Sequence, residues 1–181
     1  MAYGRNVTRN RQNRPPQSLN SARLEALALH YAARYATSRA KLATYLGRKL
    51  REAEWDDERP PAVEALVERL AELRYVDDSA YAAMRGAALT RRGYGARRVA
   101  QALDAAGVGK EGVAQSASEG WDAANAFARR KRIGPYGAGQ PDRALRDKQV
   151  GAFLRAGHDY ATAARWVDAA PGDVPDRVEE D

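Results

Sequence analysis

One stretch of the chain, residues 74–108, restricts the fold most strongly, because it contains two helix starts and the turn between them. Asp77 and Asp78 follow an apolar pair and precede an apolar-periodic run, which is the pattern of a helix N-cap. The sequence RRGYG at residues 91–95 then interrupts this run, and a second helical pattern covers residues 96–106. The stretch therefore predicts two short helices joined by a tight basic turn.

Helical patterns fill most of the remaining chain, so the sequence predicts an all-α fold. Ala, Leu, Arg and Glu are abundant, whereas β-branched residues are few and scattered. Because there are only two Phe and three Trp, the core is expected to be thin, which favours an elongated array of small units. The nine expected helices start near Asn20, after Thr37-Ser38, at Pro60-Pro61, at about 78–91, 96–106, 110–118 and 121–133, and on both sides of Gly157.

Apolar side chains at helical spacing predict which face of each helix is buried. Three of these stripes carry most of the signal, and they contain Leu24, Leu27, Tyr31 and Tyr35; Val63, Leu66, Val67, Leu70 and Leu73; and Tyr160, Ala164 and Val167. The helix before Gly157 carries Leu145, Val150, Phe153 and Leu154. We expect these side chains to face the core.

The helices also suggest a threefold repeat. The middle helices of three triplets match around Leu42, Val99 and Val150, at offsets of 57 and 51 residues, although amphipathic helices produce such matches by coincidence as well. The predicted organisation is a disordered basic arm over 1–19, three-helix repeats over 20–76, 77–119 and 120–170, and a disordered acidic tail over 171–181. Stacked repeats of this kind predict an elongated curved array.

Residues for catalysis or metal binding are missing from the sequence patterns. The chain has no cysteine, and its two histidines lack the spacing of metal ligands; at a helix end, His158 is expected as an imidazolium facing terminal carbonyls. The paired acids suit helix caps, and GYGARR lacks the Lys-Ser/Thr of a phosphate-binding loop. We therefore predict a non-enzyme with no cofactor and no metal, without a membrane segment, cytoplasmic and monomeric.

Positive charge gathers in three clusters on a chain with net charge +6 and a calculated pI of about 9.7. The candidate partner-binding residues in these clusters are Arg39 and Lys41; Arg91, Arg92, Arg97 and Arg98; and Arg129, Arg130, Lys131 and Arg132. Each cluster can be a solvated face or a set of helix-end cations, but stacked repeats would align the clusters into a basic ribbon that suits nucleic acid. Tyr94, between the arginines, either stacks on a base or fills a gap between helices.

The stretch over residues 70–108 resembles the central motif of the RecX family, the regulators of the RecA recombinase. The similar positions are Val76-Asp77-Asp78, Tyr81-Ala82, Arg91, Gly93-Tyr94-Gly95 and Arg98-Val99. Arg74 stands where the family usually has glycine, Ala80 replaces a commonly charged residue, and the connection over 55–61 is longer and more acidic than usual. The looser resemblance extends over about residues 20–168.

The resemblance implies three tandem three-helix repeats and a non-catalytic role. Its implied partner is the RecA nucleoprotein filament, which such proteins bind within the helical groove, commonly suppressing strand exchange and ATP hydrolysis. Single- or double-stranded DNA is a further expected partner of the basic body. Two alternatives are a stand-alone helix-turn-helix DNA-binding protein, centred on residues 93–95, and a helical scaffold that binds protein alone.

Overall fold

The structure, a computed structural model, describes residues 18–109 and 117–177 of the chain. This part contains eight α-helices, one short 3-10 helix and no β-strand, so the all-α prediction is confirmed for it. The helices are α1 (Ser21–Arg34), α2 (Arg39–Arg51), α3 (Val63–Glu72), α4 (Asp78–Arg91), α5 (Ala96–Asp104), α6 (Ala117–Lys131), η1 (Gly134–Tyr136), α7 (Arg143–Arg155) and α8 (Tyr160–Val167).

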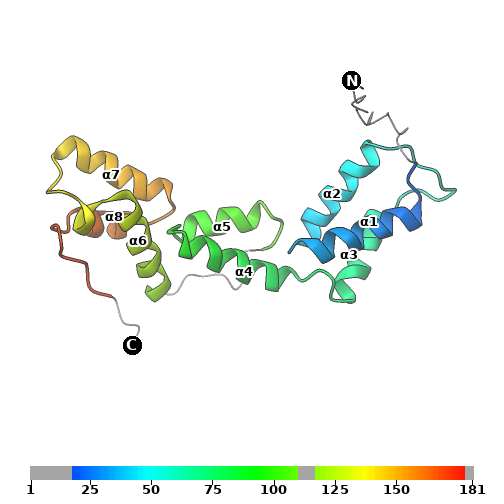
Figure 1. Ribbon diagram of the computed structural model, residues 1–181, viewed down its shortest axis with the longest axis horizontal. Helices are drawn as coiled ribbons and strands as arrows, with labels where there is room; N and C mark the ends of the chain where they lie inside the picture. Colours follow the sequence, from blue (N-terminus) through cyan, green and yellow to red (C-terminus); the bar gives the residue numbers. More distant parts are fainter. Residues whose placement is uncertain (1–17, 110–116, 178–181) are drawn as a thin grey trace, which may run out of the picture.

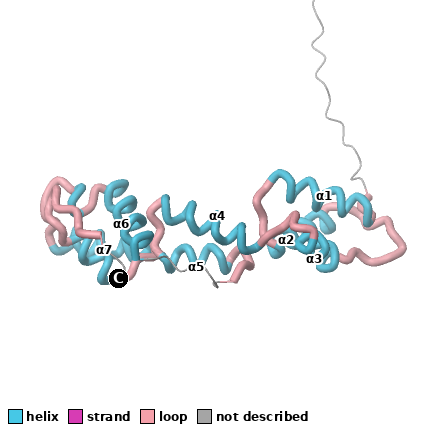
Figure 2. Tube along the Cα trace, turned by 90° about the horizontal axis from the view of Figure 1, so that it is seen from below, coloured by secondary structure: helices cyan, strands magenta, loops and turns pink. Residues whose placement is uncertain are grey.

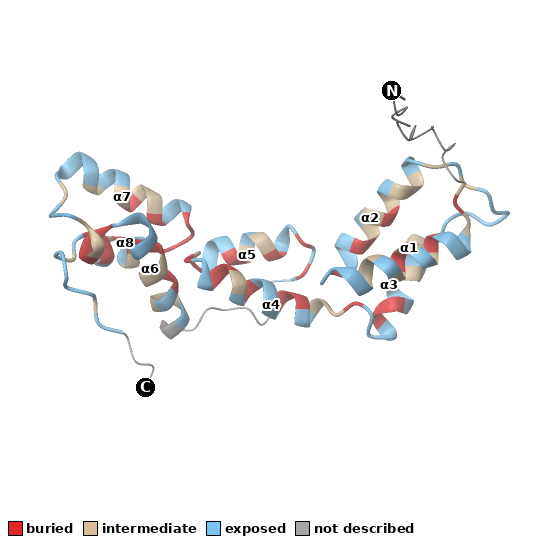
Figure 3. Ribbon diagram, viewed as in Figure 1, coloured by how far each residue is buried: buried red, intermediate tan, exposed pale blue. Residues whose placement is uncertain are grey.

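The helices form three groups that follow one another in an elongated row (Figure 1), and a perpendicular view shows the same row (Figure 2). The first group is α1–α3, the second is α4 and α5, and the third is α6–α8 with η1. Each group has its own apolar cluster, built around Leu42 and Leu70 in the first, Val99 and Leu103 in the second, and Phe153 in the third. Figure 3 shows the buried residues on the sides where helices of one group face each other.

The helix starts agree with the sequence because polar side chains cap them. Asn20, Ser38, Asp77 and Asp159 each accept a hydrogen bond from a backbone N–H in the first turn of the following helix. The oxygen–nitrogen distances lie between 2.8 and 3.3 Å. An acceptor here satisfies an N–H group that has no partner within the helix. These four predicted starts are confirmed.

Other helix boundaries differ from the prediction. Pro60 and Pro61 precede α3, which begins at Val63, so the prolines lie outside its first turn. Trp121 lies four residues inside α6, because that helix already starts at Ala117. The predicted helix over 110–118 falls almost entirely outside the described residues.

Several side chains that were expected to be inward lie on the surface. Tyr35, Leu73 and Tyr160 are 50%, 60% and 61% exposed, respectively. Tyr35 and Leu73 are C-cap residues, and Tyr160 is the first residue of α8. The prediction continued each apolar stripe to the end of its helix, where the neighbouring helix no longer covers the side chain. Leu145 and Leu154, near the two ends of α7, are exposed as well.

Both ends of the described chain pack against helices. Leu19, the last residue of the predicted arm, is buried and pairs with Trp55 in an isolated parallel bridge. Near the other end, the indole N–H of Trp121 donates to the Pro175 carbonyl at 2.8 Å, and Arg177 forms an ion pair with Asp122 at 2.6 Å. These contacts of residues 171–177 differ from the disordered tail that the composition predicted.

Candidate functional site

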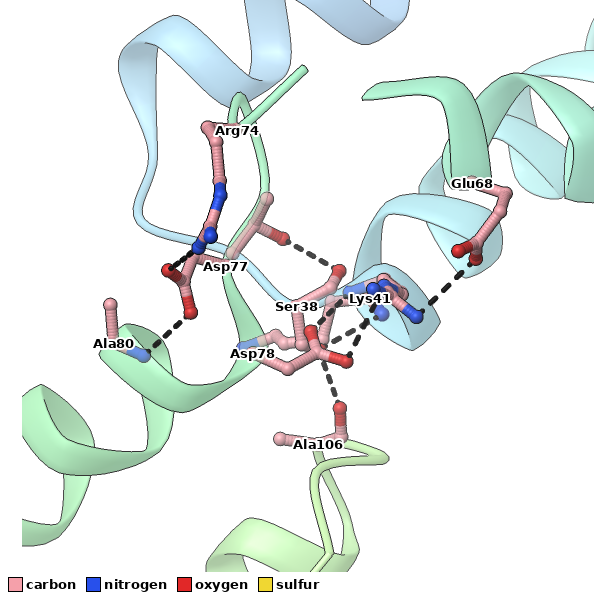
Figure 4. Close-up of polar contacts among 10 residues, drawn as sticks. Ser38, Lys41, Glu68, Arg74, Asp77, Asp78, Ala80 and Ala106 are labelled. Atoms are coloured by element: carbon pink, nitrogen blue, oxygen red, sulfur yellow. Dashed lines mark hydrogen bonds and ion pairs between the residues drawn. The ribbon is translucent and has the colours of Figure 1, made fainter. Parts of the chain in front are cut away.

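The joint between the first and second groups is organised around the start of α2 (Figure 4). Ser38 is fully buried, and its hydroxyl donates to the Ala106 carbonyl at 2.5 Å. The same oxygen accepts from the Lys41 N–H at 3.3 Å and thereby caps α2. The Ser38 side chain therefore caps α2 in the first group and also binds the turn that follows α5 in the second group. We call this contact region between the two groups the first joint.

Two of the predicted binding cations take part in the first joint. The Arg39 guanidinium lies 3.3 Å from Glu68, and its backbone N–H donates to Asp78 at 2.8 Å. The ammonium group of Lys41, which is labelled in Figure 4, donates to the Tyr81 hydroxyl at 3.0 Å. Arg39 thus has carboxylate partners, and both residues connect α2 to neighbouring helices, a role that sequence reasoning did not assign to them.

The RRGYG turn forms the second joint, between the second and third groups. The Gly95 N–H donates to the Ala156 carbonyl at 3.0 Å, and the Arg97 N–H donates to the Gly157 carbonyl at 3.2 Å. A methyl group on Gly95 would lie 2.5 Å from backbone atoms of Gly157 and His158, closer than side-chain carbons approach any neighbour. The tight basic turn that the sequence predicted is therefore also the segment against which the third group packs.

Gly93 contributes to the same joint through its backbone conformation. Its φ is +83°, in the left-handed region that favours glycine, and a Cβ there would meet the backbone nitrogen of Phe127 at 2.7 Å. Since Phe127 lies in the middle of α6, both glycines let the turn fit between α6 and the α7–α8 connection.

His158 is buried in the second joint, contrary to the prediction of a charged helix-end residue. Its Nε2 lies 3.2 Å from the Gly93 carbonyl, and its ring packs against Phe127 and Phe153. Burial lowers the pKa of this imidazole, which outweighs the opposing effects of the Gly93 carbonyl and the Asp159 carboxylate. A neutral ring with its proton on Nε2 donates to the carbonyl, so His158 is part of the packing.

The structure brings two of the three basic clusters together at the second joint. Arg130, at the end of α6, donates to the Arg92 carbonyl at the end of α4. The cations that surround this contact are all exposed, and they are Arg91, Arg92, Arg97, Arg98, Arg129, Arg130, Lys131 and Arg132. We call this set the second-joint cations. Arg39 and Lys41 lie at the other end of α4 and are not part of it.

Several of the second-joint cations have defined positions. The guanidinium of Arg129 lies 5.7 Å from the Tyr136 ring centre, and that of Arg130 lies 5.4 Å from the Phe127 ring centre. Arg98 donates to the Gln101 side chain at 3.1 Å. Such contacts hold the charged groups on helix ends without neutralising them, so a partner meets a preformed cationic surface.

Tyr94 is half-buried against the apolar cluster of α4 and α5. The Arg92 guanidinium lies 5.8 Å from its ring centre. This placement agrees with the interpretation that the ring fills a gap between helices; it leaves part of the ring beside the second-joint cations.

Sequence reasoning missed an aromatic and basic surface on α1 and α2. It assigned Tyr31 and Tyr35 to a core-facing stripe. Tyr31 does pack against the core, whereas Tyr35 is half exposed, and both line an open pocket of about 420 Å³ together with Tyr45. Spacing alone does not reveal such a surface, because an i, i+4 pair of tyrosines suits a core stripe equally well. The arginines that flank the tyrosines, Arg34 and Arg48, were a signal that could have been used.

Comparison with known proteins identifies the family. No family model matches the chain. It is 34% identical over 168 residues to the regulatory protein RecX of Myxococcus xanthus, and the aligned region covers 86% of this chain and 90% of that protein. It is 35% identical over 124 residues to the regulatory protein RecX of Agrobacterium fabrum, covering 65% and 67% of the two chains. The chain belongs to the RecX family.

Family membership gives the unusual residue at position 74 a structural meaning. The RecX-like motif leads us to expect glycine there, and Arg74 adopts a φ of +62°, in the left-handed region. Its guanidinium reaches Asp77, the N-cap of α4, at 3.5 Å (Figure 4). Arg74 therefore adopts a backbone conformation that glycine reaches without strain and that costs free energy for a residue with a side chain.

The described residues of this RecX-family chain hold no group of three or more metal-ligating side chains. In the same part of the chain, none of the helices has both the length and the apolar character that crossing a membrane requires. What the surface offers a partner is fixed positive charge on helix ends, with aromatic rings nearby.

Proposed function

We propose that this protein is a non-catalytic regulator of RecA that binds the RecA–DNA filament in the cytoplasm and lowers its ATPase and strand-exchange activities. Such a regulator would act in the control of DNA repair and recombination. The proposal is supported by the alignment with two regulatory RecX proteins, one over 86% of this chain. It needs no chemistry from the regulator itself, because a ligand that binds one filament state better than another shifts the equilibrium toward that state.

The second-joint cations carry the proposal on the structural side. They come from the ends of α4 and α6 and the start of α5. The Arg130 side chain donates to the Arg92 carbonyl between the first two, and the backbone of Gly95 and Arg97 bonds to the α7–α8 connection. A rigid cationic surface suits a partner whose own geometry is regular, such as the phosphates and acidic side chains along a filament. The elongated row of helix groups (Figure 1) provides length along such a groove.

We also propose that the three groups are tandem three-helix repeats over residues 20–76, 77–119 and 120–170. The helices at the centre of the proposed triplets, α2, α5 and α7, lie along one side of the row (Figure 1). The second group shows two helices among the described residues, and the helix predicted over 110–118 falls almost entirely outside them. A distinct hydrogen-exchange protection pattern for each range would support this organisation.

The test is a RecA assay with the full chain. RecA ATPase and strand exchange on single-stranded DNA are measured while this protein is added up to stoichiometric amounts. Inhibition of both activities is expected; activities that stay unchanged at stoichiometric protein contradict the proposal.

Charge-matched variants connect this activity to the site. Arg91 and Arg97 are exposed, and their side chains form no hydrogen bond or ion pair with the part of the chain that the structure describes. Replacing both with alanine should weaken filament binding and reduce its salt dependence. Arg59→Ala with Arg143→Ala removes the same charge from exposed positions away from the joints and should bind like the wild type. Equal binding by the two double variants would remove the second-joint cations from the proposal.

The geometry argues against the helix-turn-helix alternative. In that motif, the N-terminal residues of the second helix enter the major groove and contact base edges. Here the start of α5 contacts the α7–α8 connection, through Gly95, Arg97 and the backbone of Gly157. The third group therefore packs against the backbone at the start of α5, although the Arg97 and Arg98 side chains there stay exposed.

A further inference from the structure

Three tyrosines form a ladder on the first group. The rings of Tyr31, on α1, and Tyr45, on α2, are stacked with centres 4.2 Å apart and planes 19° apart. Tyr35 continues the ladder, with its ring centre 5.1 Å from that of Tyr31. The two inner rings pack against the apolar core of the group, whereas Tyr35 is half exposed. The ladder therefore ends in the half-exposed ring of Tyr35, which is tilted by 49° against Tyr31 and has the Arg34 guanidinium 5.8 Å from its centre.

Two pockets adjoin this ladder, and three residues line both of them. One has a volume of about 420 Å³ and includes Tyr35; the other, of about 430 Å³, extends toward Ala105 and Ala106 at the end of the second group. Tyr31, Tyr45 and Arg48 line both, so the two pockets adjoin and together form one surface between Tyr35 and the first joint. We call it the tyrosine groove.

The tyrosine groove is strongly basic. No acidic residue lines either pocket, and the cations that line them are Arg34, Lys41, Arg48, Lys49 and Arg51. Glu52 lies 2.7 Å from Lys49 and 3.8 Å from Arg48, and these contacts lower the pKa of its carboxyl. This single carboxylate offsets one of the five charges, so the groove has an excess of positive charge around an aromatic face.

From these features we infer that the tyrosine groove binds single-stranded nucleic acid. A base stacks on the exposed face of Tyr35, and the phosphates on either side contact Arg34, Arg48 and Arg51. Aromatic stacking combined with a cationic track is the general means of holding single strands, because every base has a planar face. In a duplex the faces of each base are covered by the neighbouring bases, so no base face is free to stack on Tyr35.

The inference deepens the proposed function, since single-stranded DNA is a component of the proposed filament partner. It rests on different residues, however: the tyrosine groove lies on α1 and α2, and the second-joint cations lie on α4–α6. A binding assay without RecA therefore separates the two. If the protein binds single-stranded DNA but does not inhibit RecA, only the proposed function is overturned. If it inhibits RecA but does not bind single-stranded DNA, only the inference about the tyrosine groove is overturned.

The first experiment measures binding of the full chain to a fluorescein-labelled thymidine 20-mer by fluorescence anisotropy. Tyr35→Ala should weaken binding about tenfold, within the range that removal of one stacking aromatic gives. Tyr35→Trp should bind at least as tightly as the wild type because it keeps a planar face. Tyr75→Ala is the matched control, since Tyr75 is 56% exposed but lines neither pocket, and it should bind unchanged.

The second experiment separates stacking from charge. Arg48→Ala with Arg51→Ala should lower the slope of log affinity against log salt by about 0.7 for each phosphate that the groove no longer neutralises. A 20-base-pair duplex should compete poorly, and Tyr35→Ala should not alter its binding. The inference is overturned if Tyr35→Ala and Tyr75→Ala bind the 20-mer equally, or if single strand and duplex bind alike. It is also overturned if Tyr35→Ala impairs RecA binding alone, because the groove is then a protein-docking surface.

Discussion

The close approach at the second joint leads to a quantitative prediction for Gly95→Ala. Gly95 has a φ of −75°, which alanine adopts without strain, so the substitution tests packing alone. The added methyl group would lie 2.5 Å from the carbonyl carbon and oxygen of Gly157 and from the nitrogen of His158. These are backbone atoms, which cannot rotate away as a flexible side chain would. The α7–α8 connection must therefore move away from α5.

The size of the effect follows from what this movement breaks. Overpacking costs about 1–3 kcal/mol. The hydrogen bonds from Gly95 to Ala156 and from Arg97 to Gly157 each contribute about 0.5–1.5 kcal/mol. Alanine restricts the unfolded chain and returns about 0.4–1 kcal/mol. We expect the free energy of unfolding to fall by about 2–4 kcal/mol.

Urea unfolding followed by circular dichroism measures this decrease, and hydrogen exchange of the Arg97 amide reports on the joint itself. Gly139→Ala is the control, because a Cβ at Gly139 meets nothing within 4 Å. We expect Gly139→Ala to unfold like the wild type and Gly95→Ala to expose the Arg97 amide. If the two variants unfold at the same urea concentration with equal Arg97 protection, the packing argument for the second joint is refuted.

Three further predictions concern single side chains. Ser38→Ala removes the buried hydrogen bond to Ala106 and the cap of α2, and should lower the urea-derived stability by about 1–3 kcal/mol; an unchanged midpoint contradicts this. Because burial lowers the pKa of His158, the unfolded chain binds more protons, so stability is complete above the ordinary histidine pKa and falls as the pH drops below it. His158→Gln should flatten this acid-side fall in melting temperature, and an equally steep fall would exclude His158 as its cause. Arg74→Gly relieves a φ of +62° and should raise stability by about 1 kcal/mol, whereas a lower melting temperature would show that the side chain compensates for the strain.

Local signals in the sequence were sufficient for the capped helix starts and for the helix interiors, but not for the starts of α3 and α6. Ser38, Asp77 and Asp159 cap the helices they were expected to cap, because a cap depends on residues only three positions apart. In the same way Leu42 and Val67 are buried, since neighbouring turns of one helix determine which face is apolar. These features need no knowledge of the partner helix.

Contacts between distant segments could not be read in this way. The burial of His158 depends on Gly93, 65 residues earlier, and nothing near His158 in the sequence indicates that contact. Tyr35 and Tyr160 show the opposite error: their spacing fits an apolar stripe, but each lies where its helix ends and its partner no longer covers it. Sequence periodicity assigns a side of a helix and does not say how far the neighbouring helix extends.

The RRGYG turn shows why the binding and structural interpretations of a motif need not compete. Its glycines allow backbone contact with the third group, and this contact fixes the ends of α4, α5 and α6 against each other. The arginines project from those same ends, and Arg130 binds the Arg92 carbonyl across the joint. A change that opens the joint would therefore disperse the cations even though every arginine is still present. Gly95→Ala should accordingly weaken partner binding without removing a single charge.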